Sequence, residues 1–265
     1  MKDIFRQVAV LLSTVAVIVV NGLANALPLN GQTSAEIANR LPIYFVPAGY
    51  VFSIWGLIYL GLLAYSIYQV LPSQRQNPRL RRIGWLYVLS CLANIAWLFL
   101  WHYEFFELTA VAMAALLLLL IAVYLALGTG RTRVSPAETW LVRVPFSIYL
   151  GWITVATIAN VTSLLDYLKW SGWGISPDLW AVIMLIVATI IASAVSLSRG
   201  DVAYALVIIW AFVGIAVKHS ATTNVAVTAW VAVAVVALTL LVGILVQMDR
   251  MRNRVVEDVG IRDRW

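Results

Sequence analysis

Aromatic and amide side chains recur at helical spacing through the first two thirds of the chain. Within each group they lie three or four residues apart: Asn21 and Asn25; Trp55 and Tyr59; Asn94, Trp97 and Trp101; and Tyr149, Trp152, Ala156 and Asn160. This spacing places each group on one face of a helix. Flat rings with a few amides suit the binding of a flat, mostly apolar ligand. The structural alternative is that the amides join helices and the rings pack between them.

Ionisable side chains avoid the centres of the apolar segments. All 12 acidic residues fall in predicted loops, tails or segment edges, and no lysine lies near the middle of a segment. This pattern argues against a proton pump, an ion-coupled transporter or a retinal protein, which need charge inside the membrane. His102 and His219 lie at segment ends, and Cys91 is the single cysteine. We therefore predict no catalytic set and no metal site.

The composition indicates a membrane protein. The chain is 63% hydrophobic and 11% charged, against about 25% charged residues in an average soluble domain. Uncharged runs long enough to cross a bilayer, about 20 residues each, recur throughout. The sequence predicts an all-α, polytopic bundle of about eight transmembrane helices: Val8–Leu27, Val51–Leu71, Ile83–Trp101, Leu108–Leu127, Val144–Leu165, Leu179–Leu197, Val202–Val217 and Val225–Met248.

The basic residues predict an orientation for these spans. With eight spans and a cytoplasmic N-terminus, the inner segments hold all of the 18 basic residues except Arg40, Lys169 and Lys218. This agrees with the retention of positive loops in the cytoplasm. The net charge of +6 then reflects topology rather than binding of nucleic acid. We predict a multi-pass protein of the cell (inner) membrane with both termini in the cytoplasm.

Proline and tryptophan positions suggest how the outer loops are built. Pro42 and Pro47 break the first loop, and we expect residues 29–48 to fold as a lid over the bundle. Tryptophans near span ends are typical of interfacial belts. We expect this role for Trp85, Trp101, Trp140, Trp170, Trp173 and Trp180. The remaining rings of the helical stripes are expected to face a pocket.

Three motifs resemble a known family. Pro47 followed by Trp55 and Tyr59 resembles the start of the second helix in the tryptophan-rich sensory protein and translocator protein (TspO/MBR) family. "NIAW", ending at Trp97, resembles its third helix, and "YLGWITVATIAN", ending at Asn160, resembles its fifth. The resemblance covers roughly residues 5–166. The chain departs from the family pattern by lacking a proline at position 148, by lacking the paired phenylalanines after the third-helix motif, and by continuing for three more helices.

The resemblance implies a five-helix bundle that binds flat hydrophobic molecules such as porphyrins (tetrapyrroles) or sterols, as a receptor or carrier with a sensory or transport role. We expect a ligand-binding unit at 1–166, three further helices at 167–248 and a basic cytoplasmic tail at 249–265. No cofactor is expected to be required, and a porphyrin or heme-like ligand is compatible with the site. The partners expected are the lipid bilayer and this ligand, with a homodimer left open. The predicted ligand-binding residues are Asn21, Asn25, Pro47, Trp55, Tyr59, Asn94, Trp97, Tyr149, Trp152, Ala156 and Asn160.

Two other functions remain open from the sequence. A small-solute transporter would use the asparagine-bearing faces, since "VVNGLANALP" is a hydrophobic segment with breaks suited to a binding site. A membrane enzyme would degrade a bound porphyrin through its tryptophans. No Ser-His-Asp set, metal-ligand cluster or paired carboxylate lies within the spans, so binding is the primary hypothesis.

Overall fold

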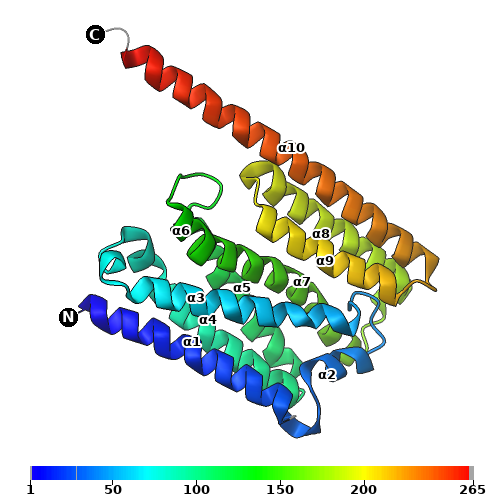
Figure 1. Ribbon diagram of the computed structural model, residues 1–265. Coiled ribbons are helices and arrows are strands. Elements are labelled where there is room, and N and C mark those ends of the chain that lie inside the picture. Colours follow the sequence, from blue (N-terminus) through cyan, green and yellow to red (C-terminus); the bar gives the residue numbers. More distant parts are fainter. Residues whose placement is uncertain (1, 28, 263–265) are drawn as a thin grey trace.

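The computed structural model describes residues 2–27 and 29–262, and these residues form an all-α structure without strands (Figure 1). The helices are α1 (Lys2–Ala26), α2 (Ser34–Arg40), α3 (Ile54–Val70), α4 (Pro78–His102), α5 (Phe106–Leu127), α6 (Pro136–Glu138), α7 (Val144–Tyr167), α8 (Pro177–Arg199), α9 (Val202–Lys218) and α10 (Thr223–Arg262). Short 3-10 turns are η1 (Leu29–Gly31), η2 (Gly49–Ser53), η3 (Pro72–Gln74) and η5 (Gly172–Gly174), and a π-helical turn, η4 (Thr139–Arg143), leads into α7.

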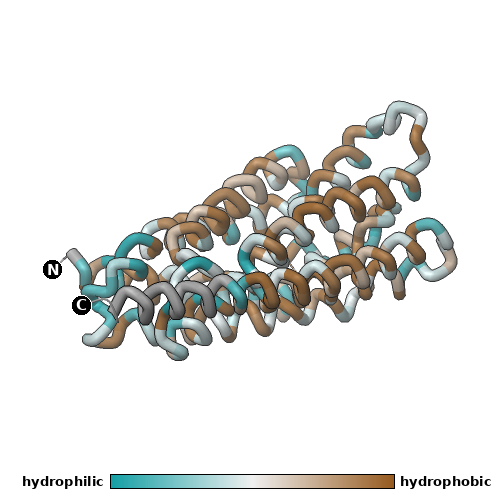
Figure 2. The backbone as a smooth tube through the Cα atoms, turned by 90° about the horizontal axis from the view of Figure 1, so that it is seen from above, coloured by the Kyte–Doolittle hydropathy of each residue, from teal (hydrophilic) through white to brown (hydrophobic). Residues whose placement is uncertain are grey.

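The helices are built to cross a membrane. Seven helical segments among the described residues are long and apolar enough to span a bilayer, and α9 is a shorter apolar helix of 17 residues. That length is close to the lower limit of about 17 residues for a transmembrane helix. Figure 2 shows hydrophobic residues along the helices and hydrophilic residues toward their ends. The protein is therefore a multi-pass integral membrane protein.

At one end of the bundle, side-chain contacts join the start of α1 to the connections between successive pairs of helices. Arg6 in α1 donates a hydrogen bond of 3.2 Å to the carbonyl of Arg75, in the loop between α3 and α4. Further contacts of this kind are Arg81 to Asp3 at 2.9 Å, Arg79 to Glu138 at 2.5 Å, Arg199 to the Thr129 carbonyl at 3.1 Å and Gln247 to the Ser198 carbonyl at 3.0 Å. The loops that carry most of the basic residues thus lie together, as the positive-charge pattern predicts.

The other helix ends meet at the opposite end. Asn30 donates to the His102 carbonyl at 3.1 Å, and Arg40 pairs with Glu104 at 2.5 Å. Lys218, at the end of α9, donates to Asn39 at 2.6 Å. With α9 included, eight helices therefore run alternately between the two ends, so α9 behaves as the seventh pass despite its length.

The turn between α8 and α9 explains how the chain reverses within so few residues. Gly200 follows α8 with a φ of 60°, the left-handed conformation that ends many helices and that glycine adopts without strain. Asp201 then caps α9 by accepting a hydrogen bond from the backbone N–H of Tyr204 at 3.2 Å. The segment "SRGD" is thus a helix stop followed directly by a helix start.

Several predicted boundaries differ from the observed helices. The first loop contains α2, which the hydropathy pattern did not predict. α10 continues well past the predicted end of its span at Met248, through the first part of the predicted tail. The two ends differ because hydropathy predicts where the chain leaves the apolar phase, whereas helical hydrogen bonding can continue into the polar phase. Met1 and residues 263–265 lie outside the described residues.

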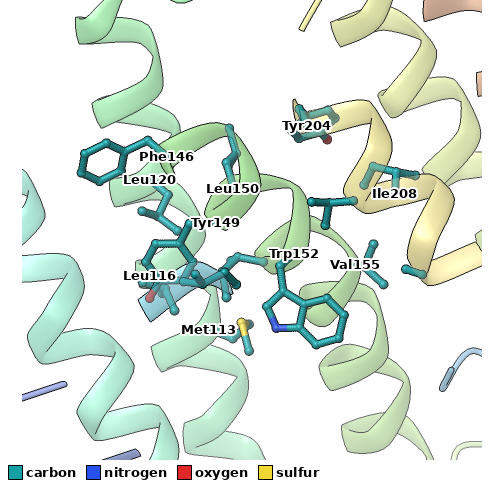
Figure 3. Close-up of a cluster of buried hydrophobic side chains, with 14 of the residues drawn as sticks. Met113, Leu116, Leu120, Phe146, Tyr149, Leu150, Trp152, Val155, Tyr204 and Ile208 are labelled. Atoms are coloured by element: carbon teal, nitrogen blue, oxygen red, sulfur yellow. The ribbon is translucent and has the colours of Figure 1, made fainter. Parts of the chain in front are cut away.

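α7 is the central helix of the bundle. Figure 3 shows its residues Tyr149 and Trp152, with Met113 of α5 and Ile208 of α9 among the surrounding side chains. On α7, a Cβ built at Gly151 would lie 3.1 Å from the Tyr204 carbonyl oxygen, so this glycine permits close packing against α9. α7 also packs against α3 and α5, and therefore links the first five spans to the last three.

Buried polar contacts strengthen this link. Asp201, at the start of α9, is 8% exposed. Its carboxylate accepts hydrogen bonds from the hydroxyls of Tyr124 in α5 at 2.9 Å and Ser147 in α7 at 2.6 Å. Glu138 is also buried and is paired with Arg79. These carboxylates occupy segment edges, as predicted, but they are embedded in the protein, where they fasten helices together.

Candidate functional site

A cavity lies between α2, the following loop, α3, α4 and α7. The segment predicted as a lid, residues 29–48, contains η1 and α2, and from here on the lid denotes residues 41–53, which connect α2 to α3 and include η2. The space that a water-sized molecule can reach inside the cavity is about 60 Å³. It is lined by Ser34, Ala38, Val46, Pro47, Phe52, Trp55, Trp97, Trp101, Trp152, Val155, Ala156, Ala159, Asn160 and Ser163. The lining carries no charged side chain.

Tryptophans form the walls of this cavity. Trp55 stacks on Tyr59 with ring centroids 5.4 Å apart and planes 19° apart. Trp97 stacks in the same way on Trp101, at 5.8 Å and 19°. Trp152 meets Trp55 edge to face at 6.2 Å and 81°. Stacked and perpendicular pairs of this kind are favourable arrangements of aromatic rings, so the walls present flat ring surfaces.

Some polar atoms of the lining residues have no hydrogen-bond partner. Within the described part of the chain, Nε1 of Trp97, Nε1 of Trp152 and both amide atoms of Asn160 are buried and unpaired. Trp101 differs, because its indole N–H donates to the Ser34 carbonyl at 3.2 Å. Buried polar groups are nearly always hydrogen-bonded, and exceptions often mark a site that a ligand or water completes. The residues that line the cavity therefore carry two indole donors and one amide without partners, while the surface of the cavity itself is almost entirely apolar.

The predicted asparagine stripes meet in a separate network. Asn21 in α1 donates to the side-chain oxygen of Asn94 in α4 at 2.9 Å, and Asn94 donates to the hydroxyl of Tyr149 in α7 at 3.0 Å. All three side chains are buried. This chain of hydrogen bonds joins three helices and satisfies the amides. It favours the structural interpretation of these asparagines over a solute path through them.

The predicted site residues thus fall into four sets. The cavity brings together Pro47, Trp55, Trp97, Trp152, Ala156 and Asn160. Tyr59 supports the wall from behind through its stacking on Trp55. Asn21, Asn94 and Tyr149 form the network, which touches the wall where Tyr149 meets Trp55 at 6.1 Å. Asn25 is exposed and donates only to the Asn21 carbonyl among its described contacts, at 2.9 Å.

The expected role of Trp101 as an interfacial belt residue is wrong. Trp101 is 4% exposed and lines the cavity. Its place near a span end resembled that of a belt residue, but α2 covers that end of α4 and buries the ring. The spacing to Trp97 was the available signal, because residues four apart share a helix face. Trp85, Trp140 and Trp173 are exposed at helix ends, as belt residues should be.

Other lining residues were not singled out from the sequence. On α7 these are Val155, Ala159 and Ser163. Ala159 lies three residues after Ala156, and Ser163 lies three residues after Asn160, so periodicity could have found both. Those of α2 and the lid, Ser34, Ala38, Val46 and Phe52, depend on how the first loop folds back, which no local pattern encodes.

Comparison with known proteins identifies the family. The family model described as TSPO-like protein matches residues 7–242. No curated protein and no solved structure matches the chain. The family match starts in α1 and ends in α10, and it therefore continues beyond residues 5–166, where the motifs lie, into the last three helices. The chain belongs to the family of TSPO-like proteins.

Proposed function

We propose that this protein is a membrane receptor or carrier that binds flat hydrophobic ligands, such as porphyrins or sterols, in the tryptophan-lined cavity. The observation that carries the proposal is the combination of stacked ring walls with unpaired polar atoms on Trp97, Trp152 and Asn160. A cavity and unpaired donors both cost free energy in a structural core. Other buried polar atoms of the described residues, such as the Tyr65 hydroxyl, are also unpaired, so the support for a site is that three such residues surround one cavity.

The chemistry of the lining matches such ligands. A planar ring system gains from offset stacking on tryptophan faces. The carboxylates of a porphyrin, or the hydroxyl of a sterol, can accept hydrogen bonds from the indole N–H groups of Trp97 and Trp152. The amide of Asn160 can donate or accept. Because the lining has no charged group, discrimination would come from shape and from these few polar contacts.

The size of the cavity adds a condition. Its 60 Å³ is far below the volume of pockets for drug-sized ligands, about 300–1,000 Å³, and a tetrapyrrole is larger than this space. Binding of a porphyrin therefore requires the lid or the tryptophan side chains to move outward. We infer that the arrangement described is too narrow for such a ligand and that ligand affinity includes the free energy of widening the site.

We also propose an orientation. The basic loops that meet at one end of the bundle face the cytoplasm, together with both termini, in the cell (inner) membrane. The lid and α2 belong to the other end, where Asn39 contacts Lys218. The cavity then opens toward the outer half of the bilayer or the outer aqueous phase.

Porphyrin titration of the full-length protein in lipid nanodiscs tests the proposed function. Protoporphyrin is added while tryptophan fluorescence is recorded, and the titration is repeated with Trp152→Phe, Asn160→Leu and the control Trp230→Phe. Trp230 is half exposed on α10. Asn160→Leu should weaken binding roughly tenfold, the cost of losing one or two hydrogen bonds in a buried site. A sterol that competes would extend the ligand class.

Quenching that is equal in all variants would show that porphyrin does not occupy this cavity. Absence of saturable quenching in the parent protein would refute porphyrin as a ligand altogether. Trp152→Phe should reduce the maximum quenching and also the affinity, because it removes one indole donor while retaining a ring. Trp230→Phe should change the starting fluorescence alone.

A further inference from the structure

The lid is held by α9, a helix that comes about 160 residues later in the chain. Three hydrogen bonds join them: the Ala48 N–H donates to the Gly214 carbonyl at 3.1 Å, the indole of Trp210 donates to the Val51 carbonyl at 3.2 Å, and Nε2 of His219 donates to the Val46 carbonyl at 3.2 Å. Just before the lid, Asn39 accepts from Lys218. Three backbone groups of the lid, the Ala48 N–H and the carbonyls of Val46 and Val51, are thus bonded to this distant segment, while other lid groups bond within the lid.

Close packing accompanies these bonds. A Cβ built at Gly214 would lie 2.2 Å from Cγ2 of Val51 and 3.0 Å from Cβ of Pro47. Real side chains do not approach so closely, so the lid can rest on α9 at this point only because Gly214 has no side chain. Two ring contacts flank the glycine: Tyr50 with Trp210 at 5.2 Å, and Tyr44 with His219 at 5.3 Å.

The same lid residues form part of the cavity wall. Val46 and Pro47 line the cavity and also contact α9, through the Val46 carbonyl and the ring of Pro47. Phe52 lines the cavity and meets Trp152 edge to face at 5.7 Å. The lid is therefore a single layer of chain between the cavity and α9.

α9 is itself fixed to the cavity's main wall. Its first residues are bound through Asp201 to Ser147 of α7 at 2.6 Å. One turn later the hydroxyl of Tyr204 donates to Thr154 of α7 at 3.2 Å. α7, which carries Trp152, and α9, which contacts the lid, are thus bonded to each other. Displacement of the lid therefore requires its contacts with α9 to break.

We propose that α9 is the anchor of the lid: Trp210, Gly214 and His219 hold residues 41–53 in the position that closes the cavity, and a ligand larger than the cavity enters when these contacts open. None of the three residues lines the cavity, so they are positioning residues for the site. The part of this inference that concerns the ligand rests on the proposed function. The part that concerns the lid does not, because it is a statement about the ligand-free protein.

Hydrogen exchange of the lid amides tests the anchor without any ligand. The full-length protein in nanodiscs is compared with Trp210→Phe, His219→Phe and Gly214→Ala. The first two keep an aromatic ring and remove one donor each. They should accelerate exchange in residues 43–53 roughly two- to tenfold, as expected for loss of one hydrogen bond. Gly214→Ala should do the same by pushing Val51 away, although alanine stabilises a helix.

Matched controls separate lid opening from general loosening. Gly22 in α1 has no atom within 4 Å of a Cβ built on it, so Gly22→Ala should leave lid exchange unchanged. Trp230→Phe serves the same purpose for the tryptophan. Exchange in α5 should stay at the parent level in all variants. Lid exchange at the parent rate in the three α9 variants would overturn the proposal, because the lid would then be held by something other than these contacts.

Porphyrin binding kinetics test the second half of the inference. Stopped-flow quenching should show faster association in the variants whose lid amides exchange faster, while Gly22→Ala binds at the parent rate. Faster lid exchange combined with an unchanged association rate would overturn the gating role. If the parent protein binds no porphyrin, the proposed function fails, and the exchange experiment still decides whether α9 anchors the lid.

Discussion

The side-chain amide of Asn94 and the hydroxyl of Tyr149 lie 3.0 Å apart and join α4 to α7 beside the tryptophan walls. Asn94 is completely buried and also accepts a hydrogen bond from Asn21. One residue therefore connects three helices through hydrogen bonds between side chains. The network touches the cavity wall through the contact of Tyr149 with Trp55.

Replacing Asn94 with leucine should destabilise the bundle. Two hydrogen bonds between helices are lost, and measured bonds of this type in membrane proteins suggest a cost of about 1–2 kcal/mol in total. Thermal unfolding in detergent measures the change. Asn25→Leu is the matched control, since Asn25 is exposed and donates to a backbone carbonyl of its own helix. Equal unfolding temperatures for the two variants would contradict a structural role of the network.

Removing the carboxylate of Asp201 should loosen the junction between α9 and the first five spans. Asp201→Ala leaves the hydroxyls of Tyr124 and Ser147 without their acceptor, at a cost of about 2–3 kcal/mol. Unfolding temperature and proteolysis of the loop at residues 199–201 would report the loss. Asp166→Ala, at an exposed position, should have little effect. Stability that is unaffected by Asp201→Ala would mean that these hydrogen bonds do not secure α9.

Acidic pH should loosen the lid through His219. Burial, and secondarily the nearby charge of Lys218, hold the pKa of His219 below its ordinary value of 6.5, although the hydrogen bond to Val46 acts in the opposite direction. The groups that contact the ring are Tyr44 and the Val46 carbonyl. The folded protein therefore favours the neutral imidazole. The contribution of neutral His219 to the stability of the folded state is complete above pH 6.5, and it is lost as the pH falls through the lower pKa of the folded state.

Lid exchange measured between pH 7.5 and pH 5, and corrected for the intrinsic pH dependence of exchange, checks this expectation. Opening should become more frequent toward pH 5 in the parent protein and should be independent of pH in His219→Phe. The same pH dependence in both proteins would assign the effect to another group.

Cysteine labelling tests the orientation. In a Cys91→Ala background, single cysteines replace Ser73, Ser171 or Arg262, and intact cells are treated with an impermeant thiol reagent. Ser73 and Ser171 are exposed and lie at opposite ends of the bundle. Only the cysteine at position 171 should react. Labelling at position 262 would place the end of α10 outside, which is incompatible with α9 as a complete pass.

The membrane-spanning helices and most of the tryptophan walls could be predicted from the sequence, because hydropathy and helical periodicity can be read from short stretches of chain. Trp152, Ala156 and Asn160 share a face of α7 on spacing alone. The capping box formed by Thr33 and Glu36, which starts α2, was also present in the sequence as T-x-x-E. Its significance was hidden because the helix is short and lies in a loop.

The remaining features arise from contacts between distant segments. The burial of Trp101 depends on α2, and the position of Val51 depends on Gly214. Hydropathy identifies α9 as an apolar helix, but it does not indicate that the lid packs against it. Glycine in a membrane helix is common, so only the folded structure shows that Gly214 accommodates the lid.

The contact between Trp210 and Val51, 159 residues apart in the chain, has a consequence for biosynthesis. Translation proceeds at about 5–20 residues per second, so roughly 8–30 s separate the synthesis of the lid from that of its anchor. During this interval the nascent chain already contains α3 and α4 and, toward its end, α7, with their tryptophans, but the hydrogen bonds of Trp210, Gly214 and His219 with the lid are still missing. A hydrophobic molecule present at the site of membrane insertion would meet an open cavity, and the arrival of α9 would enclose it.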